Sequence, residues 1–145
     1  MKTSLLTGVA LDYAALKAYG VIDADMRGTK NLKGNPHKRY CYMDKKGFRC
    51  SRKTAVAIFD FKYGKVAQPS SDWDYGMVIL EEFNISLRAP VGAGIITKNK
   101  KGEPIWTAYS PDCMIDGMDK DPLVALMRCF VAMKLGDEVT LPEKL

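Results

Sequence analysis

The last part of the chain has the clearest pattern of apolar and polar positions. Apolar residues recur there with helical spacing and form one broad stripe, made by Leu123, Leu126, Met127, Phe130 and Met133. Asp121 is a suitable N-cap, and Pro122 fits the first helical position. Gly136 stands where helices commonly end in a left-handed conformation. The pattern therefore predicts a helix over residues 122–135.

A helix is also predicted near the start of the chain, over about residues 8–19. Its apolar positions follow a helical period and include Val9, Tyr13 and Leu16. Thr7 is expected to cap its first turn, and Gly20 is placed to end it.

A third helix is predicted over about 72–83, with Ser71 as its N-cap. The 4-3-3 spacing of its large apolar residues predicts one buried face, formed by Trp73, Met77, Leu80 and Phe83. Gly76 costs such a helix about 1 kcal/mol relative to alanine. A glycine at this place indicates close packing against a neighbour, or a ligand that approaches the backbone.

Strands are predicted where short apolar or β-branched runs end at turn residues. These runs lie at 39–43, 48–51, 55–61, 85–87, 95–97 and 105–109. We expect one hairpin between the first two runs and another joining residues 96 and 105. The chain has 145 residues, close to the commonest domain size of roughly 100–150. Together these patterns predict an α+β fold, one small domain over 1–145 with a mainly antiparallel sheet and about three helices.

Positive charge is concentrated in a turn-rich segment at about 25–55. Residues 25–56 contain ten lysines and arginines but two aspartates, which gives this segment +8 of the chain's total of +5 and leaves −3 for the rest. Aromatic residues alternate with the cations, a pattern that suits phosphate contact and base stacking. The candidate nucleic-acid residues over 27–53 are Arg39, Tyr40, Tyr42, Lys45, Lys46, Phe48 and Arg49. The alternative is a solvated loop.

The N-terminal segment does not have the long apolar centre of a secretion signal, and no apolar run approaches the roughly 18–20 residues that span a bilayer. We therefore expect a cytoplasmic protein without a membrane partner. In that compartment the four cysteines are expected to be reduced. His37, Cys41 and Cys50 make a weak zinc hypothesis, since their spacing lacks the close cysteine pairs of structural zinc sites.

Catalytic patterns are scarce. His37 is the only histidine, and histidine most often supplies the general base at neutral pH. No phosphate-binding loop is found, because Gly92-Ala93-Gly94 lacks the downstream Gly-Lys-Ser/Thr of that motif. No catalytic residue and no cofactor are expected, and a binding role is favoured over an enzymatic one.

Three stretches of the sequence resemble a known family. They are Leu6-Thr7-Gly8-x-x-Leu11-Asp12-Tyr13, Ser70-Ser71-Asp72-Trp73-x-x-Gly76-x-x-Ile79, and Trp106-x-Ala108 followed by Pro122 to Val139 and Pro142. This pattern is similar to the NinX-like proteins of tailed phages and prophages, a family of unknown function. The resemblance implies a phage accessory protein that acts in the host bacterial cytosol, and it implies no particular activity.

Several residues in these stretches are candidates for binding a ligand. An indole beside a carboxylate can stack on a base and accept its hydrogen bonds, and an arginine can pair with phosphate. A free helix start can hold an anion. The candidate set is Thr7, Asp12, Asp72, Trp73, Gly76, Trp106, Tyr109 and Arg128. The alternative is that both tryptophans are core anchors and that Arg128 pairs with an acid.

The leading hypothesis is a binder of a nucleotide-like small molecule or a host factor, in one form a sponge for a host immune nucleotide signal. The first alternative is association with nucleic acid through residues 27–53. The second alternative is hydrolysis of such a nucleotide. A homo-oligomer is also possible, through methionines such as Met77, Met118 and Met133.

Overall fold

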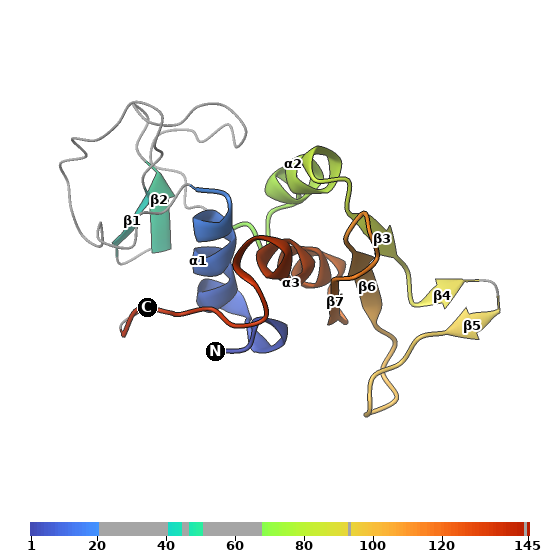
Figure 1. Cartoon of the computed structure of the whole chain (residues 1–145). Helices are drawn as coiled ribbons and strands as arrows, with labels where there is room; N and C mark the ends of the chain where they lie inside the picture. The colour runs from blue at the N-terminus through green and yellow to red at the C-terminus, as the bar shows by residue number, and fades with distance from the viewer. Residues whose placement is uncertain (21–40, 45–46, 51–67, 93, 144) are drawn as a thin grey trace.

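The computed structural model describes residues 1–20, 41–44, 47–50, 68–92, 94–143 and 145, and helix α3 (Pro122–Leu135) lies at their centre (Figure 1). Its bounds agree with those predicted from the apolar stripe. The Asp121 carboxylate caps the helix by accepting from the amide nitrogens of Leu123 at 2.8 Å and Val124 at 3.4 Å. Gly136 follows with a φ of 88°, a conformation that favours glycine.

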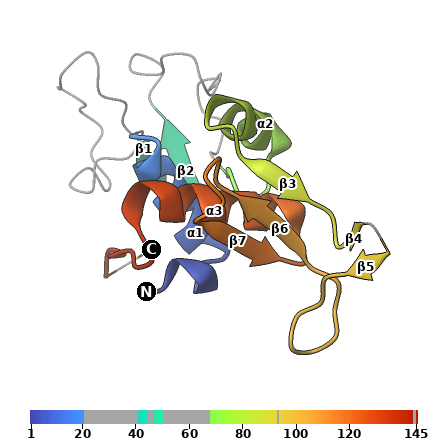
Figure 2. The ribbon, with the colours of Figure 1, turned by 45° about the vertical axis from the view of Figure 1, so that its right-hand side comes forward.

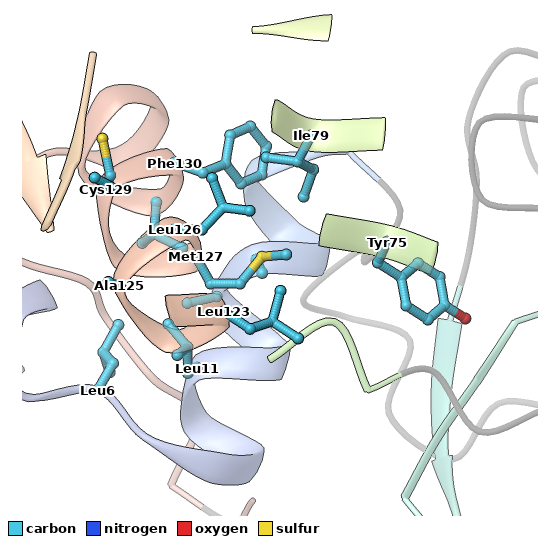
Figure 3. Close-up of a cluster of buried hydrophobic side chains, with 14 of the residues drawn as sticks. Leu6, Leu11, Tyr75, Ile79, Leu123, Ala125, Leu126, Met127, Cys129 and Phe130 are labelled. Atoms are coloured by element: carbon cyan, nitrogen blue, oxygen red, sulfur yellow. The ribbon is translucent and has the colours of Figure 1, made fainter. Parts of the chain in front are cut away.

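Residues on all sides of α3 are buried, because the helix is packed between other elements. Helix α1 (Gly8–Ala18) and helix α2 (Trp73–Glu82) contact it, and a sheet covers another side. Figure 3 shows the resulting core, in which side chains of α3 meet Leu11 of α1 and Ile79 of α2. The α3 side chains at this centre are Leu123, Leu126, Met127, Cys129 and Phe130.

The sheet has three antiparallel strands in the order β3 (Ser86–Arg88), β6 (Trp106–Tyr109) and β7 (Asp116–Asp119). One face packs on α3 (Figure 2). Ala108 and Gly117 are paired on that face. A Cβ at Gly117 would overlap the carbonyl oxygen of Ala125 and the amide nitrogen of Cys129. The α+β prediction is confirmed, although β7 was not predicted because its sequence, Asp-Gly-Met-Asp, lacks the residues that mark strands.

Helix α1 agrees closely with its prediction, whereas the cap predicted for α2 is wrong. Thr7 occupies the N-cap position of α1 and makes no capping hydrogen bond with its side chain. In α2 the N-cap is Asp72, one residue after the predicted Ser71, and its carboxylate accepts from the amide nitrogen of Asp74 at 3.0 Å.

The predicted buried face of α2 is also wrong. Tyr75, Gly76 and Ile79 are buried, whereas Trp73 is 41% exposed and Met77 is 47% exposed. Leu80 and Phe83 are only partly buried against the core. The glycine explains the difference. At Gly76 a Cβ would lie 2.5 Å from Cδ1 of Leu123, so the side that lacks a side chain is the one that approaches α3 most closely. The close packing expected at Gly76 is confirmed.

Two small hairpins complete the described residues. Strands β1 (Cys41–Asp44) and β2 (Gly47–Cys50) pair antiparallel, which confirms the first predicted hairpin. Strands β4 (Val91–Gly92) and β5 (Ile95–Ile96) form the other. The hairpin predicted to join residues 96 and 105 is reduced to one bridge, between Lys98 and Pro104, with its neighbouring hydrogen bonds. The reason is that β6 pairs with β3 and β7 instead. The strand predicted at 55–61 lies outside the described residues.

Candidate binding site

A buried hydrogen bond joins α1 to the segment that leads into α2. The Asp12 carboxylate, on α1, accepts from the amide nitrogen of Ser70 at 2.7 Å, and both residues are buried. Burial raises the pKa of Asp12 above its ordinary value, and the Ser70 hydrogen bonds oppose that rise. Because Ser70 stands three residues before α2, this bond fixes the segment that leads into the helix against α1. It also brings together two stretches that are far apart in the sequence.

The first turn of α2 presents an indole ring to solvent beside carboxylates. Trp73 directly follows the cap residue Asp72, and Asp74 is exposed next to it. The Trp73 ring lies along its own helix, since a Cβ at Gly76 would come within 3.1 Å of ring atom Cε3. Gly76 therefore has two neighbours, Leu123 on the core side and Trp73 on the outer side.

Three carboxylates act on the buried tyrosine of this turn. Tyr75 is buried, and its hydroxyl end points away from the α3 side chains (Figure 3). Burial raises the pKa of Tyr75, and the negative charges of Asp72, Asp74 and Asp12 raise it further. A flat ring among carboxylates suits a heteroaromatic group that carries N–H donors or a positive charge. It is unfavourable for a phosphate.

Arg128 occupies a different place, under the sheet. Its Nε donates to the carbonyl oxygen of Leu6 at 3.0 Å, and its Nη1 donates to the carbonyl oxygen of Met118 at 2.6 Å. The same Nη1 lies 2.7 Å from a carboxylate oxygen of Asp119. The side chain is nearly buried. This geometry is that of the alternative interpretation, in which Arg128 pairs with an acid, and it joins three segments of the chain.

The remaining candidates do not converge on Trp73. Trp106 and Tyr109 are three residues apart in β6, so they lie on opposite faces of the sheet. Trp106 packs partly against the core, and Tyr109 is paired with Ser86 and Asp116. Thr7 is exposed and adjoins Leu6, the residue bound by Arg128. The structure thus groups Asp12, Asp72, Trp73 and Gly76, and it separates the other four from them.

Three residues that organise these places, Ser70, Tyr75 and Asp119, were not predicted as site residues. Ser70 and Tyr75 lie within the motif that runs from Ser70 to Ile79. If Gly76 had been counted as a packing position, Tyr75 and Ile79 would have been placed on the side of α2 that faces the core. Asp119 carries no local signal, because its partner Arg128 is nine residues away across a turn and the start of a helix.

The metal and nucleic-acid hypotheses fall largely outside the described residues. Five of the candidate residues lie outside the described residues: His37, Arg39, Tyr40, Lys45 and Lys46. Within the hairpin, Cys41 is opposite Cys50, Tyr42 is opposite Arg49, and Met43 is opposite Phe48. Among the residues that the structure describes, no cluster of three or more His, Cys, Asp or Glu side chains could hold a metal ion. The same part of the chain has no helix long and apolar enough to cross a membrane.

Comparison with known proteins decides the family. The family model described as Bacteriophage P22, NinX matches residues 2–134. The chain belongs to this phage family. The resemblance to NinX-like proteins is thereby confirmed, and the matched range contains both contacts that join its motifs, Asp12 with Ser70 and Arg128 with Leu6. A search of curated proteins gave no match.

Proposed function

We propose that this NinX family protein is a phage accessory protein that binds a nucleotide-type small molecule through its base, at the start of α2. The observation that carries the proposal is the partly exposed ring of Trp73, held along the helix above Gly76 and flanked by the carboxylates of Asp72 and Asp74. A base can stack on the open side of this ring. Its exocyclic amino group can donate to a neighbouring carboxylate.

The charges around Trp73 narrow the ligand class. Asp12, Asp72 and Asp74 act together on Tyr75, and Arg128 is bonded elsewhere. A phosphate placed beside these carboxylates would be repelled. The base and ribose are therefore the parts of the ligand that contact the protein, and any phosphates extend outward. Adenine, guanine and cytosine derivatives fit best, because each has an amino group.

One form of this function is sequestration of a host immune nucleotide signal. Tight binding without catalysis would suffice for that role. Membership of a phage family supports a role during infection of a host. Hydrolysis of the same ligand is the competing enzymatic form. Incubating the protein with ligand and analysing the mixture by mass spectrometry separates the two, because sequestration returns the ligand intact.

The test is a fluorescence titration of a Trp106→Phe variant, in which Trp73 is the remaining tryptophan. The probes are adenosine, AMP, ADP-ribose and a cyclic dinucleotide. We expect saturable quenching, with adenosine bound at least as tightly as AMP because of the nearby carboxylates. Base stacking contributes about 1–3 kcal/mol, so Trp73→Ala should weaken binding by about fivefold or more in a calorimetric titration.

Two variants serve as controls for this titration. Asp72→Asn keeps a good N-cap residue and removes the charge. It should weaken the binding of ligands that carry an amino group while leaving thermal stability nearly unchanged. Met77→Ala, one turn further along α2, should bind normally. Binding that survives Trp73→Ala, or no binding by any probe, would contradict the proposal. Steeply salt-dependent binding to a single-stranded oligonucleotide, without binding of mononucleotides, would favour the role of residues 27–53 instead.

A further inference from the structure

The solvent face of α2 exposes an apolar side chain between two acids. Met77 is 47% exposed, and Asp74 and Glu81 are exposed three residues before it and four residues after it. Residues at these spacings share one side of a helix. This α2 face, defined as Asp74, Met77 and Glu81, points away from α3, because Tyr75, Gly76 and Ile79 form the opposite, buried side.

A second surface has similar apolar character and the opposite charge. The arm consists of β4, β5 and the loop 97–104, and it extends away from the helices and from α2 in both views (Figures 1 and 2). Val91 is 64% exposed and Ile96 is 50% exposed, and they are cross-strand partners. Three exposed lysines follow on the loop, Lys98, Lys100 and Lys101.

The loop of the arm is held in one shape by its own hydrogen bonds. Oδ1 of Asn99 accepts from the amide nitrogens of Lys101 at 2.9 Å and Glu103 at 3.0 Å. Nδ2 of Asn99 donates to the Glu103 carboxylate at 2.9 Å. Since the one acid of the loop is bonded in this way, the three lysines dominate its surface. A preformed loop loses little conformational entropy on binding.

We propose that the arm of one molecule docks on the α2 face of a second copy of this chain. Val91 and Ile96 would cover Met77, and the loop lysines would lie beside Asp74 and Glu81. A two-stranded hairpin is marginally stable in water when it stands alone, so an exposed apolar pair on such an arm is best explained by a surface that covers it. Two reciprocal contacts about a two-fold axis close the assembly as a dimer.

This self-association goes beyond the proposed ligand binding and does not depend on it. Trp73 is not part of the α2 face, whereas Asp74 adjoins the ligand site and belongs to that face, so the assembly is measured without ligand. Failure of the ligand titration would leave the dimer unaffected, and a monomeric protein could still bind its ligand at Trp73. The two proposals therefore fail separately.

Sedimentation velocity and light scattering on ligand-free protein test the dimer. The chain has a mass of 16.1 kDa, so we expect twice that value in low salt at micromolar concentration, falling towards the monomer as salt is raised. The triple variant Lys98→Glu, Lys100→Glu, Lys101→Glu should be monomeric, and so should the double variant Asp74→Lys, Glu81→Lys.

Mixing the two charge-reversed variants gives the deciding result. In the mixed dimer both contacts have complementary charges, one with acids on the arm and lysines on α2 and the other with the wild-type charges, so association should be restored. The milder variant Val91→Ser, Ile96→Ser keeps all charges and should weaken the dimer at least tenfold. Lys120→Glu, an exposed lysine outside the arm, should associate normally. A monomer at every concentration, or a dimer that both reversals leave intact, would overturn the proposal.

Discussion

Arg128 is a buried cation whose guanidinium holds three parts of the chain together. It reaches the carbonyl of Leu6 before α1, the carbonyl of Met118 in β7 and the carboxylate of Asp119. Asp119 also accepts from the amide nitrogen of Asp121 at 3.0 Å, next to the start of α3. Arginine suits this position because its planar group donates in several fixed directions.

Replacing Arg128 should therefore affect folding before it affects any ligand. Removing one partner of a buried pair leaves the other charge and two carbonyl oxygens unsatisfied, which costs about 3 kcal/mol. We expect Arg128→Met to lower the free energy of unfolding by about that amount in urea denaturation. Lys120→Met, an exposed lysine nearby in sequence, should change it by less than about 0.5 kcal/mol. A change of less than about 1 kcal/mol for Arg128→Met would show that the pair contributes little.

At the scale of elements, the contact between β7 and α3 is unusually close. Gly117 faces the helix backbone at the pair of residues Ala125 and Cys129, and its strand neighbour Ala108 is fully buried. Backbone atoms cannot rotate out of the way as a side chain can. The sheet can therefore lie this near to α3 only because two adjacent positions on it carry small residues.

A single methyl group at this contact should be costly. Gly117→Ala would push β7 away from α3, and overpacking of this kind costs about 1–3 kcal/mol or more. We expect a loss of at least about 2 kcal/mol in urea denaturation. Gly92→Ala is the matched control, because Gly92 is also in a strand and a Cβ there would meet nothing within 4 Å. Equal stability of the two variants would contradict the close contact.

At the scale of the whole molecule, hydrogen bonds join segments that are far apart in the sequence. Asp12 binds Ser70. The N-terminal amine donates to the carbonyl oxygen of Val139 at 2.8 Å, and Thr3 donates to the carbonyl oxygen of Gly136 at 2.7 Å. The two chain ends thus pair beside α1 and α3 (Figure 1). The Asp12 bond should give global stability a dependence on pH.

Burial raises the pKa of Asp12, so the folded state holds this proton more tightly than the unfolded state does. The resulting stabilisation is present below the unfolded pKa of about 4 and is lost as pH rises through the folded pKa. Asparagine keeps an oxygen for Ser70 and does not ionise. The stability of Asp12→Asn relative to the wild-type protein should therefore increase as pH rises above about 4, measured by urea denaturation from pH 3 to 7.

The alanine variant supplies the control for this pH series. Asp12→Ala removes the acceptor of a buried N–H group and should lose about 1–3 kcal/mol even at low pH. A stability difference between Asp12→Asn and wild type that stays flat across the series would show that the carboxyl does not have a raised pKa.

Local patterns were sufficient for part of the fold. The helix over 122–135 was predicted with its bounds, because its cap, its proline, its apolar stripe and its final glycine are all written in adjacent residues. The first helix and the β1–β2 hairpin were predicted for similar reasons. The buried side of α2 was not predicted correctly. Which side is buried depends on how closely Leu123 of α3 approaches Gly76, and the apolar spacing of the helix does not show this.

The candidate site was predicted as one set of residues chosen by their chemistry. In the structure these residues lie in more than one place. Trp73, Asp72, Asp12 and Gly76 do lie in one region, whereas Arg128, Trp106 and Tyr109 are placed on other elements. The sequence by itself determined the three helices, the β1–β2 hairpin, the family and the charge distribution, since these depend on neighbours along the chain. Only the tertiary structure decided that Arg128 is bonded internally and that Trp73 is exposed, because burial and pairing depend on residues that become neighbours only after folding.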